Sequence, residues 1–296
     1  MSIVSLHAEK SEPLRRSEHA DTDALIVVIR TPKSASTSLA AIAADAFAGT
    51  RSFFLPNTLD IEGSISALQH VRHVRHTARL NYRWHRRLRL SQVFDRIAAQ
   101  ARAGDIITGG HIDFETCRRN LSRPLKFVTL VRHPVDRSLS EYAYARAGYV
   151  RKRGLAKIDA SLVAKAAARH SFEGYLDFLI DHRAAFADIA CRHVGLLPTD
   201  DIAAHFAANA FHYGSVDNLS AFARTLSAKT GRDVNEHHLN QTASPARLKL
   251  SPGERRKVEN LYAGDLALYE WVRAHEAQLP QRPQGRPALD LVSAHA

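Results

Sequence analysis

The feature that most constrains the fold is an apolar run that leads directly into a turn and a helix. Residues 24–30 read ALIVVIR, a continuous apolar stretch typical of a strand covered on both faces. A turn containing Pro32 follows, and then the alanine-rich stretch 34–49, which ends at a glycine and is predicted to be helical. The order strand, tight turn, helix is the arrangement in which proteins hold phosphate groups at a helix N-terminus.

The same order recurs further along the chain. DIITGGH at 105–111 is predicted to be a short strand with a glycine turn, and KFVTLVR at 126–132 a third strand. The stretch 134–148 begins with proline and ends in glycine, as helices often do. FHYGSV at 211–216 is typical of a fourth strand. Strands that alternate with helices predict an α/β fold with a central, mostly parallel sheet flanked by helices.

The remaining segments complete the expected organisation. Further helices are predicted over 91–104, within 160–212, after 216 and over 251–276, whereas 50–64 is predicted to be a loop. We expect a flexible N-terminal arm over 1–22, one domain over 23–277 and a C-terminal tail over 278–296, and we find no internal repeat.

Charge and cysteine content narrow the function classes. The 296 residues carry a net charge of +11, with a pI of about 9.9, which favours an anionic partner: nucleic acid, a membrane surface or an anionic small substrate. Cys117 and Cys191 provide no disulfide framework and are expected to be reduced. The first 20 residues contain no apolar run of seven, and no 18-residue apolar stretch occurs. We therefore expect a cytoplasmic protein without a transmembrane segment, with peripheral binding at the membrane surface as an open alternative.

The turn after the first strand has the composition of an anion-binding loop. Backbone N–H groups and the positive end of the helix dipole would face an anion there. The loop adds a mobile positive charge at Lys33 and hydroxyl donors, which are those of Ser34, Ser36, Thr37 and Ser38. It lacks the GxxxxGK[ST] spacing of nucleoside triphosphatases. The alternative is an ordinary N-capping turn, in which serine and threonine are common.

A second strand–turn–helix unit has its own phosphate-binding signature. In FVTLVRHPVDRSLSEYAYAR (127–146), Arg132 ends the strand and Ser140 lies about two helical turns later. The planar guanidinium of an arginine can bind a phosphate through two hydrogen bonds, and a serine hydroxyl can complete the site. The alternative is a surface ion pair between the arginine and Asp136 or Glu141. Two such sites on one sheet suggest a nucleotide with two separate phosphate groups.

These two motifs resemble those of a known family. RTPKSASTSL (30–39) resembles the 5′-phosphosulfate loop of sulfotransferases that use 3′-phosphoadenosine 5′-phosphosulfate (PAPS), and LVRHPVDRSLSEY (130–142) resembles their 3′-phosphate motif. The chain is most similar to the heparan sulfate/uronyl 2-O-sulfotransferase-like branch. Further similar segments are GGHIDF (109–114), FHYGSVDNLSAFARTL (211–226) and LNQTASPARLKLSPGERRKVENLYAGDLALYEWV (239–272).

The resemblance implies a fold, a reaction and roles for individual residues. It implies a P-loop-like three-layer fold and transfer of a sulfuryl group from PAPS to a hydroxyl of a carbohydrate or glycolipid acceptor, which could be acidic, with 3′-phosphoadenosine 5′-phosphate (PAP) as product and no metal. His111 matches the catalytic base, and Lys33 would neutralise charge on the leaving oxygen. Where the family has a first histidine, this chain has Gly109. The expected nucleotide-binding residues are Arg30, Lys33, Ser34, Ala35, Ser36, Thr37, Ser38, Arg132, Ser140, Thr242 and Lys249.

An arginine-rich stretch offers a surface for an anionic ligand. Residues 70–90 contain seven arginines and no acidic residue. On a helix, five of the arginines fall on one face within an arc of roughly 80°. They are Arg72, Arg75, Arg79, Arg83 and Arg86, of which the first four are candidate acceptor ligands. The alternative is a solvated helix face, or one that binds lipid headgroups or nucleic acid without specificity.

Two other functions stay open at this point. A P-loop-type nucleotide kinase would use similar strand ends, although the motif spacing differs and no clear metal-binding acidic residue follows a strand. A non-catalytic protein could use the stretch 70–90 to bind nucleic acid or a membrane surface. The oligomeric state cannot be read from the sequence.

Overall fold

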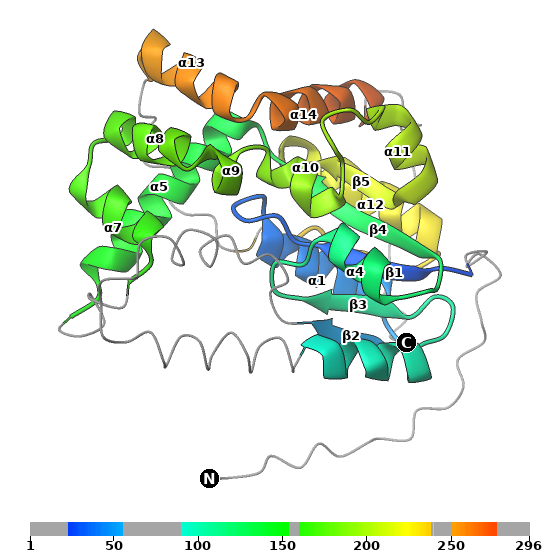
Figure 1. Ribbon diagram of the computed structural model, residues 1–296. Helices are drawn as coiled ribbons and strands as arrows, with labels where there is room; N and C mark the ends of the chain where they lie inside the picture. Colours follow the sequence, from blue (N-terminus) through cyan, green and yellow to red (C-terminus); the bar gives the residue numbers. More distant parts are fainter. Residues whose placement is uncertain (1–22, 56–89, 154–159, 238, 240–249, 277–296) are drawn as a thin grey trace, which may run out of the picture.

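The protein has an α/β fold built on a five-stranded, fully parallel sheet. The computed structural model describes residues 23–55, 90–153, 160–237, 239 and 250–276 (Figure 1). The strands are β1 (Leu25–Ile29), β2 (Ser52–Leu55), β3 (Ile106–Gly109), β4 (Leu125–Val131) and β5 (Ala210–Ser215). Their order is β2-β3-β1-β4-β5, and each neighbouring pair is parallel. The expected fold class is confirmed.

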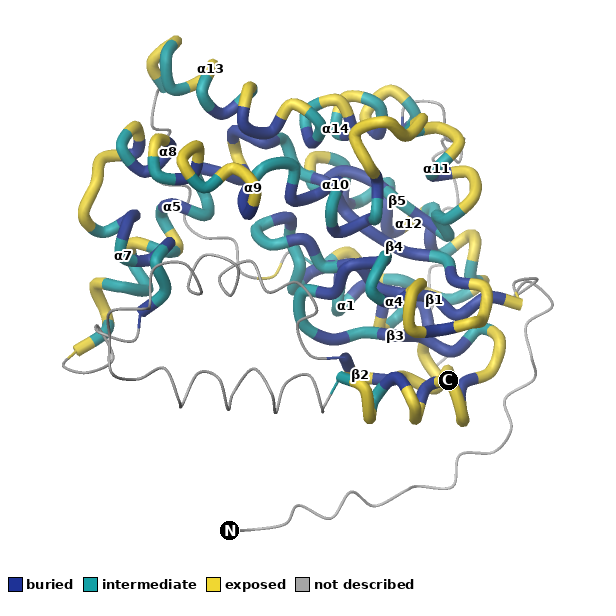
Figure 2. Tube along the Cα trace, viewed as in Figure 1, coloured by how far each residue is buried: buried dark blue, intermediate teal, exposed yellow. Residues whose placement is uncertain are grey.

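The central strand β1 is buried on both faces, as its unbroken apolar run predicts (Figure 2). Because side chains alternate along a strand, Leu25, Val27 and Ile29 pack into one hydrophobic cluster, and Ile26 and Val28 pack into another on the opposite face. β3 and β4 are the two neighbours of β1. The turns that follow β1, β3 and β4 therefore converge at the carboxyl edge of the sheet, where open parallel sheets bind ligands.

Helices cover both faces of the sheet and complete three layers. The cluster around Ile26 and Val28 is closed by α1 (Ser36–Ala46) and α12 (Leu219–Thr230). The opposite face packs against a helix at 90–100, α4 (Phe114–Asn120), α10 (Ile189–Val194), α11 (Ile202–Asn209) and α14 (Ala263–Glu276). A short 3-10 turn, η2 (Val216–Asn218), joins β5 to α12.

A helical lobe stands beside the carboxyl edge of the sheet (Figure 1). It consists of α5 (Pro134–Val150), α7 (Leu162–Arg169), α8 (Phe172–Asp181), α9 (Arg183–Phe186) and α13 (Pro252–Leu261). A third hydrophobic cluster, which includes Tyr142, Tyr175 and Tyr262, holds these helices together. Because α5 leaves directly from the end of β4, it connects this lobe to the sheet.

Two of the expected elements differ in the structure. The segment 50–64 was predicted to be a loop, but residues 52–55 form the edge strand β2. Four residues with alternating burial are too short a pattern to recognise, and the strand exists because β3 pairs with it. The stretch 251–276 forms two helices, α13 and α14, with a break at Tyr262.

Several expectations fall on parts of the chain that the structure does not describe. These are the arm at 1–22, the tail at 278–296, the arginine-rich stretch at 70–90 with Arg72, Arg75, Arg79 and Arg83, and the two late nucleotide-binding candidates Thr242 and Lys249. Within the described ranges, no helix is long and apolar enough to cross a membrane. Both cysteines, Cys117 and Cys191, are buried free thiols, as expected.

A buried arginine in α5 connects this helix to α14 and to Tyr262, the residue between α13 and α14. The side chain of Arg137 is 1% exposed and lies 3.4 Å from a carboxylate oxygen of Asp265 and 3.6 Å from one of Glu141. Its guanidinium also lies over the ring of Tyr262, 4.3 Å from the centroid. Asp265 in turn accepts a hydrogen bond from the backbone N–H of Cys191 in α10. Arg137 lies between Arg132 and Ser140 in the sequence, but its side chain is engaged in this buried cluster.

We predict that Arg137→Met lowers the free energy of unfolding by about 3–5 kcal/mol, because removing one partner of a buried ion pair leaves an unpaired buried carboxylate. The matched control is Arg118→Met, which breaks an exposed pair with Glu115 and should cost below about 1 kcal/mol. Urea denaturation of the two variants measures both values. Equal losses of unfolding free energy in the two variants would contradict the stabilising role described for Arg137.

Candidate functional site

The loop between β1 and α1 has an unusual backbone conformation. Lys33 and Ala35 both have positive φ, at 63° and 50°, a region that non-glycine residues occupy at a cost on the order of 1–2 kcal/mol each. Ala35 is the N-cap of α1 and provides no side-chain cap to the first helical turn. A strained loop that leaves a helix N-terminus without a side-chain cap is typical of a loop shaped to bind an anion.

Two hydroxyl groups in this loop are buried without a partner among the described residues. Thr31 and Ser34 are each 1% exposed, and neither side-chain oxygen has a hydrogen bond within that part of the chain. Buried polar groups almost always have partners, so these two donors are suited to a ligand. Ser36 and Thr37 lie in the first turn of α1.

Ser38 connects α1 to a segment far along the chain. Its hydroxyl accepts a hydrogen bond from the backbone N–H of Leu239 at 3.0 Å and lies 3.4 Å from the carbonyl oxygen of the same residue. The side chain therefore anchors the chain that follows α12 onto α1. Its role in nucleotide binding stays a prediction.

Arg30 donates hydrogen bonds that connect the start of α1 to the end of β3. Its Nε donates to the carbonyl oxygen of Ser36 at 2.9 Å, and its Nη1 donates to the carbonyl oxygen of Gly109 at the end of β3. The side chain thus ties α1 to the neighbouring strand. Because these carbonyls engage its guanidinium, Arg30 holds the loop after β1 in place. Direct contact of Arg30 with a nucleotide stays a prediction.

Arg132 joins the two strand–turn–helix units. Its Nη1 donates a hydrogen bond of 3.0 Å to the carbonyl oxygen of Lys33, in the loop after β1. Burial lowers the pKa of Arg132, while the nearby Asp136 and Asp217 act in the opposite direction. Ser140 lies half-buried on the second turn of α5. The two predicted phosphate sites are therefore neighbours on adjacent strands.

The side chain of Lys33 reaches towards α5. Its ammonium nitrogen lies over the ring of Tyr144, 4.0 Å from the centroid. Burial and the positive charge of Arg132 lower the pKa of Lys33, and Glu141 acts in the opposite direction. Burial raises the pKa of Glu141, although Arg137 and Lys33 both favour its charged form. The loop, the end of β4 and the second and third turns of α5 are thus in contact with one another.

His111 lies at the same edge of the sheet, two residues after the end of β3. Its Nδ1 lies 2.7 Å from the carbonyl oxygen of Arg30, and because a carbonyl can only accept, Nδ1 carries the proton. In the neutral ring, Nε2 then holds the lone pair that a general base needs. Burial lowers the pKa of His111, and the charges of Arg30 and Lys33 lower it further, against the opposing hydrogen bond to Arg30. The histidine is therefore neutral at pH 7.

A second histidine packs against the first. The ring of His193, from α10, lies edge-on to His111 with 6.3 Å between centroids. His193 is fully buried and donates from Nδ1 to the carbonyl oxygen of Ile189 at 2.8 Å. Burial lowers its pKa to about 4. His193 therefore places an uncharged ring against one side of His111.

Gly109 is required by the backbone of this protein. Its φ is +153°, and an added Cβ would lie 1.8 Å from the carbonyl oxygen of Leu55 in β2. No side chain fits there while β2 pairs with β3.

The carboxylates near His111 in the sequence, those of Asp113 and Glu115, already have hydrogen-bond or ion-pair partners. Asp113 caps α4 by accepting from the backbone N–H of Thr116 at 2.7 Å, and Glu115 pairs with Arg118 and Arg119 at 2.8 Å each. Both carboxylates therefore make contacts that stabilise α4.

In comparisons with known proteins, the chain matches no protein-family model and no curated protein sequence. The site is therefore interpreted from its own residues.

The sequence did not identify every residue at this site. Tyr144 could have been found, because it follows Ser140 by four residues and shares its helix face. The i, i+4 spacing of Arg137 and Glu141 was also visible. His193 had no local signal, because its contact with His111 depends on how α10 packs on the sheet.

We predict that Gly109→Ala lowers the free energy of unfolding by more than about 3 kcal/mol, because the added methyl group must displace β2 or β3. The control is Gly104→Ala, at φ +81° with nothing within 4 Å of the added Cβ, which should cost only about 1 kcal/mol. Thermal unfolding of both variants tests the difference. Equal losses of stability would show that β2 can move away from β3 at little energetic cost.

Proposed function

We propose that this protein is a PAPS-dependent sulfotransferase that transfers a sulfuryl group to a hydroxyl of a carbohydrate acceptor. The observation that carries the proposal is the 3.0 Å hydrogen bond from Arg132 to the carbonyl oxygen of Lys33. It joins an anion-binding loop to the arginine of a second phosphate motif on the adjacent strand. A nucleotide with phosphate groups on both its 5′ and 3′ positions matches such a pair of sites.

The described residues fit the donor. The strained loop offers the uncapped first turn of α1, and the buried hydroxyls of Thr31 and Ser34 have no partner within the described part of the chain. These groups suit the 5′-phosphosulfate. Arg132 and Ser140 suit the 3′-phosphate, since a guanidinium and a hydroxyl provide charge-assisted and neutral donors.

The reaction needs a base for the acceptor hydroxyl. In the proposed step, His111 Nε2 takes the hydroxyl proton as the acceptor oxygen forms its bond to sulfur and the bond between sulfur and the 5′-phosphate oxygen breaks. The carbonyl of Arg30 holds the ring in the required tautomer and accepts from Nδ1 in the charged form as well. Lys33 and the helix N-terminus stabilise the negative charge that grows on the leaving oxygen.

We predict that Arg132→Ala weakens PAP binding by roughly 30- to 150-fold, because a lost charge-assisted contact costs about 2–3 kcal/mol. Binding of adenosine 5′-phosphosulfate, which lacks the 3′-phosphate, should weaken less, because it loses only the support that Arg132 gives to the loop through the carbonyl oxygen of Lys33. Ser140→Ala should act in the same direction with a smaller effect. Calorimetry with both ligands makes the measurement, and Arg123→Ala, an exposed arginine in the turn before β4, is the control. Equal losses for the two ligands would make Arg132 a purely structural residue.

We predict that His111→Ala lowers kcat by about 10²- to 10⁴-fold, the usual contribution of a general base, while PAP binding survives. In the wild type, the activity should fall on acidification with a midpoint below pH 6.5, because burial lowers the pKa of His111 and only the neutral ring accepts a proton. His170→Ala, which removes an exposed histidine, should leave both quantities unchanged. Near-normal kcat in the His111 variant would refute the assignment.

The nucleotide kinase alternative predicts a different ligand preference. A thermal-shift series with PAP, ATP and an oligonucleotide separates the three functions, since the sulfotransferase should be stabilised most by PAP. Stronger stabilisation by ATP would favour the kinase, and by the oligonucleotide a nucleic-acid-binding protein.

A further inference from the structure

Lys33 is held at both its backbone and its side chain by the segment that contains β4 and α5. Its carbonyl oxygen accepts a hydrogen bond of 3.0 Å from Arg132, which directly follows β4. Its ammonium nitrogen lies 4.0 Å from the centre of the Tyr144 ring, in α5. One continuous strand–turn–helix unit therefore sets where the backbone of Lys33 lies and where its positive charge lies.

The backbone conformation of Lys33 contributes to this placement. Its φ of 63° is in the left-handed region, which non-glycine residues rarely adopt. In this conformation the side chain leaves the loop in the direction of α5. A lysine side chain is long and flexible and carries much rotamer entropy, so a contact at its end decides where the charge is found.

One face of α5 carries the groups around this ammonium. Tyr144 follows Ser140 by four residues and Glu141 by three, the spacings at which side chains meet on a helix. Burial lowers the pKa of Lys33, whereas the carboxylate of Glu141 acts in the opposite direction. The face of α5 that carries Ser140, a predicted phosphate ligand, thus also holds the ammonium group of Lys33.

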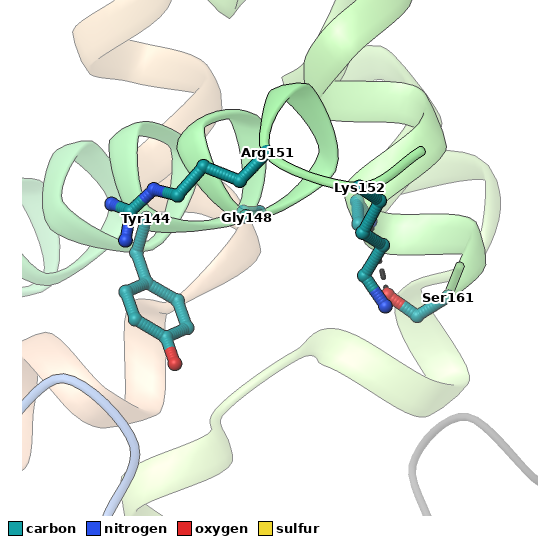
Figure 3. Close-up of a pocket in the computed structure, with 7 residues that line it drawn as sticks. Tyr144, Gly148, Arg151, Lys152 and Ser161 are labelled. Atoms are coloured by element: carbon teal, nitrogen blue, oxygen red, sulfur yellow. Dashed lines mark hydrogen bonds between the residues drawn. The ribbon is translucent and has the colours of Figure 1, made fainter. Parts of the chain in front are cut away.

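The ring of Tyr144 contributes little to the core of the helical lobe, because the residue is 66% exposed. Figure 3 shows the ring standing away from the axis of α5, and Tyr144 borders a hollow of about 460 Å³ between α5 and α7. Replacing the ring therefore tests its contact with Lys33 without removing a core side chain.

We propose that Tyr144 is a positioning residue, which holds the ammonium group of Lys33 at the anion site both before and after the nucleotide binds. The proposal rests on the proposed function, in which Lys33 stabilises charge on the leaving oxygen. The face of the ring attracts the cation, and the N–H groups that point away from the ring stay available to phosphate oxygens. A lysine that is already in place loses less side-chain entropy when the nucleotide binds.

Calorimetry with PAP tests the consequence for binding. Tyr144→Leu should weaken PAP binding roughly 2- to 5-fold, the contribution of a cation–π contact at a partly exposed site. Tyr144→Phe should bind PAP like the wild type, because the contact uses the face of the ring. In a Lys33→Ala background, Tyr144→Leu should have no further effect, since a positioning residue acts only through the lysine.

The matched control is Tyr149→Leu, the same substitution elsewhere on α5, which should leave PAP binding unchanged. Thermal unfolding of each variant confirms that it folds.

Nuclear magnetic resonance tests the contact in the absence of any nucleotide. In protein with isotopically labelled lysine, the ε-methylene protons of Lys33 should resonate upfield, because they adjoin an ammonium that lies over an aromatic ring. The signal is assigned by its loss in Lys33→Ala. Tyr144→Leu should move it downfield and Tyr144→Phe should not, and in the wild type it should stay upfield when PAP is added.

The outcomes separate this proposal from the one on which it rests. If the Lys33 signal of the free protein is not shifted upfield, or if Tyr144→Leu binds PAP as tightly as the wild type or more tightly, Tyr144 does not position the lysine, and the sulfotransferase proposal stands. Equal effects of Tyr144→Leu with and without Lys33 would likewise overturn the positioning role. If the wild type does not bind PAP although the upfield signal is present, the proposed function is overturned, and the contact with Tyr144 is structural.

Discussion

The hydrogen bond between Arg132 and the carbonyl oxygen of Lys33 links the parts of the site that act together. It spans two neighbouring parallel strands and holds the loop after β1 against the turn after β4. The loop can keep its strained conformation at Lys33 and Ala35 because this bond and the two donated by Arg30 fix its backbone from both sides. A geometry that these contacts set before a ligand arrives lowers the cost of ordering the site on binding.

The charged side chains of this protein differ in how deeply they are buried, and the deeply buried ones make structural contacts. Arg137 lies deep among Asp265, Glu141 and Tyr262, and these contacts tie α5, which carries Ser140 and Tyr144, to α14. Five residues earlier, Arg132 is only half-buried and faces the loop. His111 is neutral because burial and nearby cations disfavour its charged form. These differences between similar side chains follow from where the helices pack.

Much of this arrangement was predictable from local patterns. The apolar run ALIVVIR predicted the buried central strand β1, and Pro134 predicted the start of α5. The edge strand β2 was missed because a four-residue strand depends on its partner rather than on its own sequence. Around the site, Lys33 and Arg132 could be recognised from the strand–turn–helix pattern, and His111 only from the family resemblance. The role of Gly109 depends on a close approach of Leu55 that no local pattern encodes. The contact of His193 with His111 also arises from tertiary packing alone.

The central claim is that two neighbouring turns hold the two phosphates of one nucleotide. A crystal structure of the protein with PAP tests it most directly. The account predicts the 5′-phosphate within hydrogen-bonding distance of the loop at 33–38 and the 3′-phosphate within the same distance of Arg132 and Ser140. A nucleotide bound elsewhere, or one whose 3′-phosphate points into solvent while Arg132 keeps only its bond to Lys33, would contradict it.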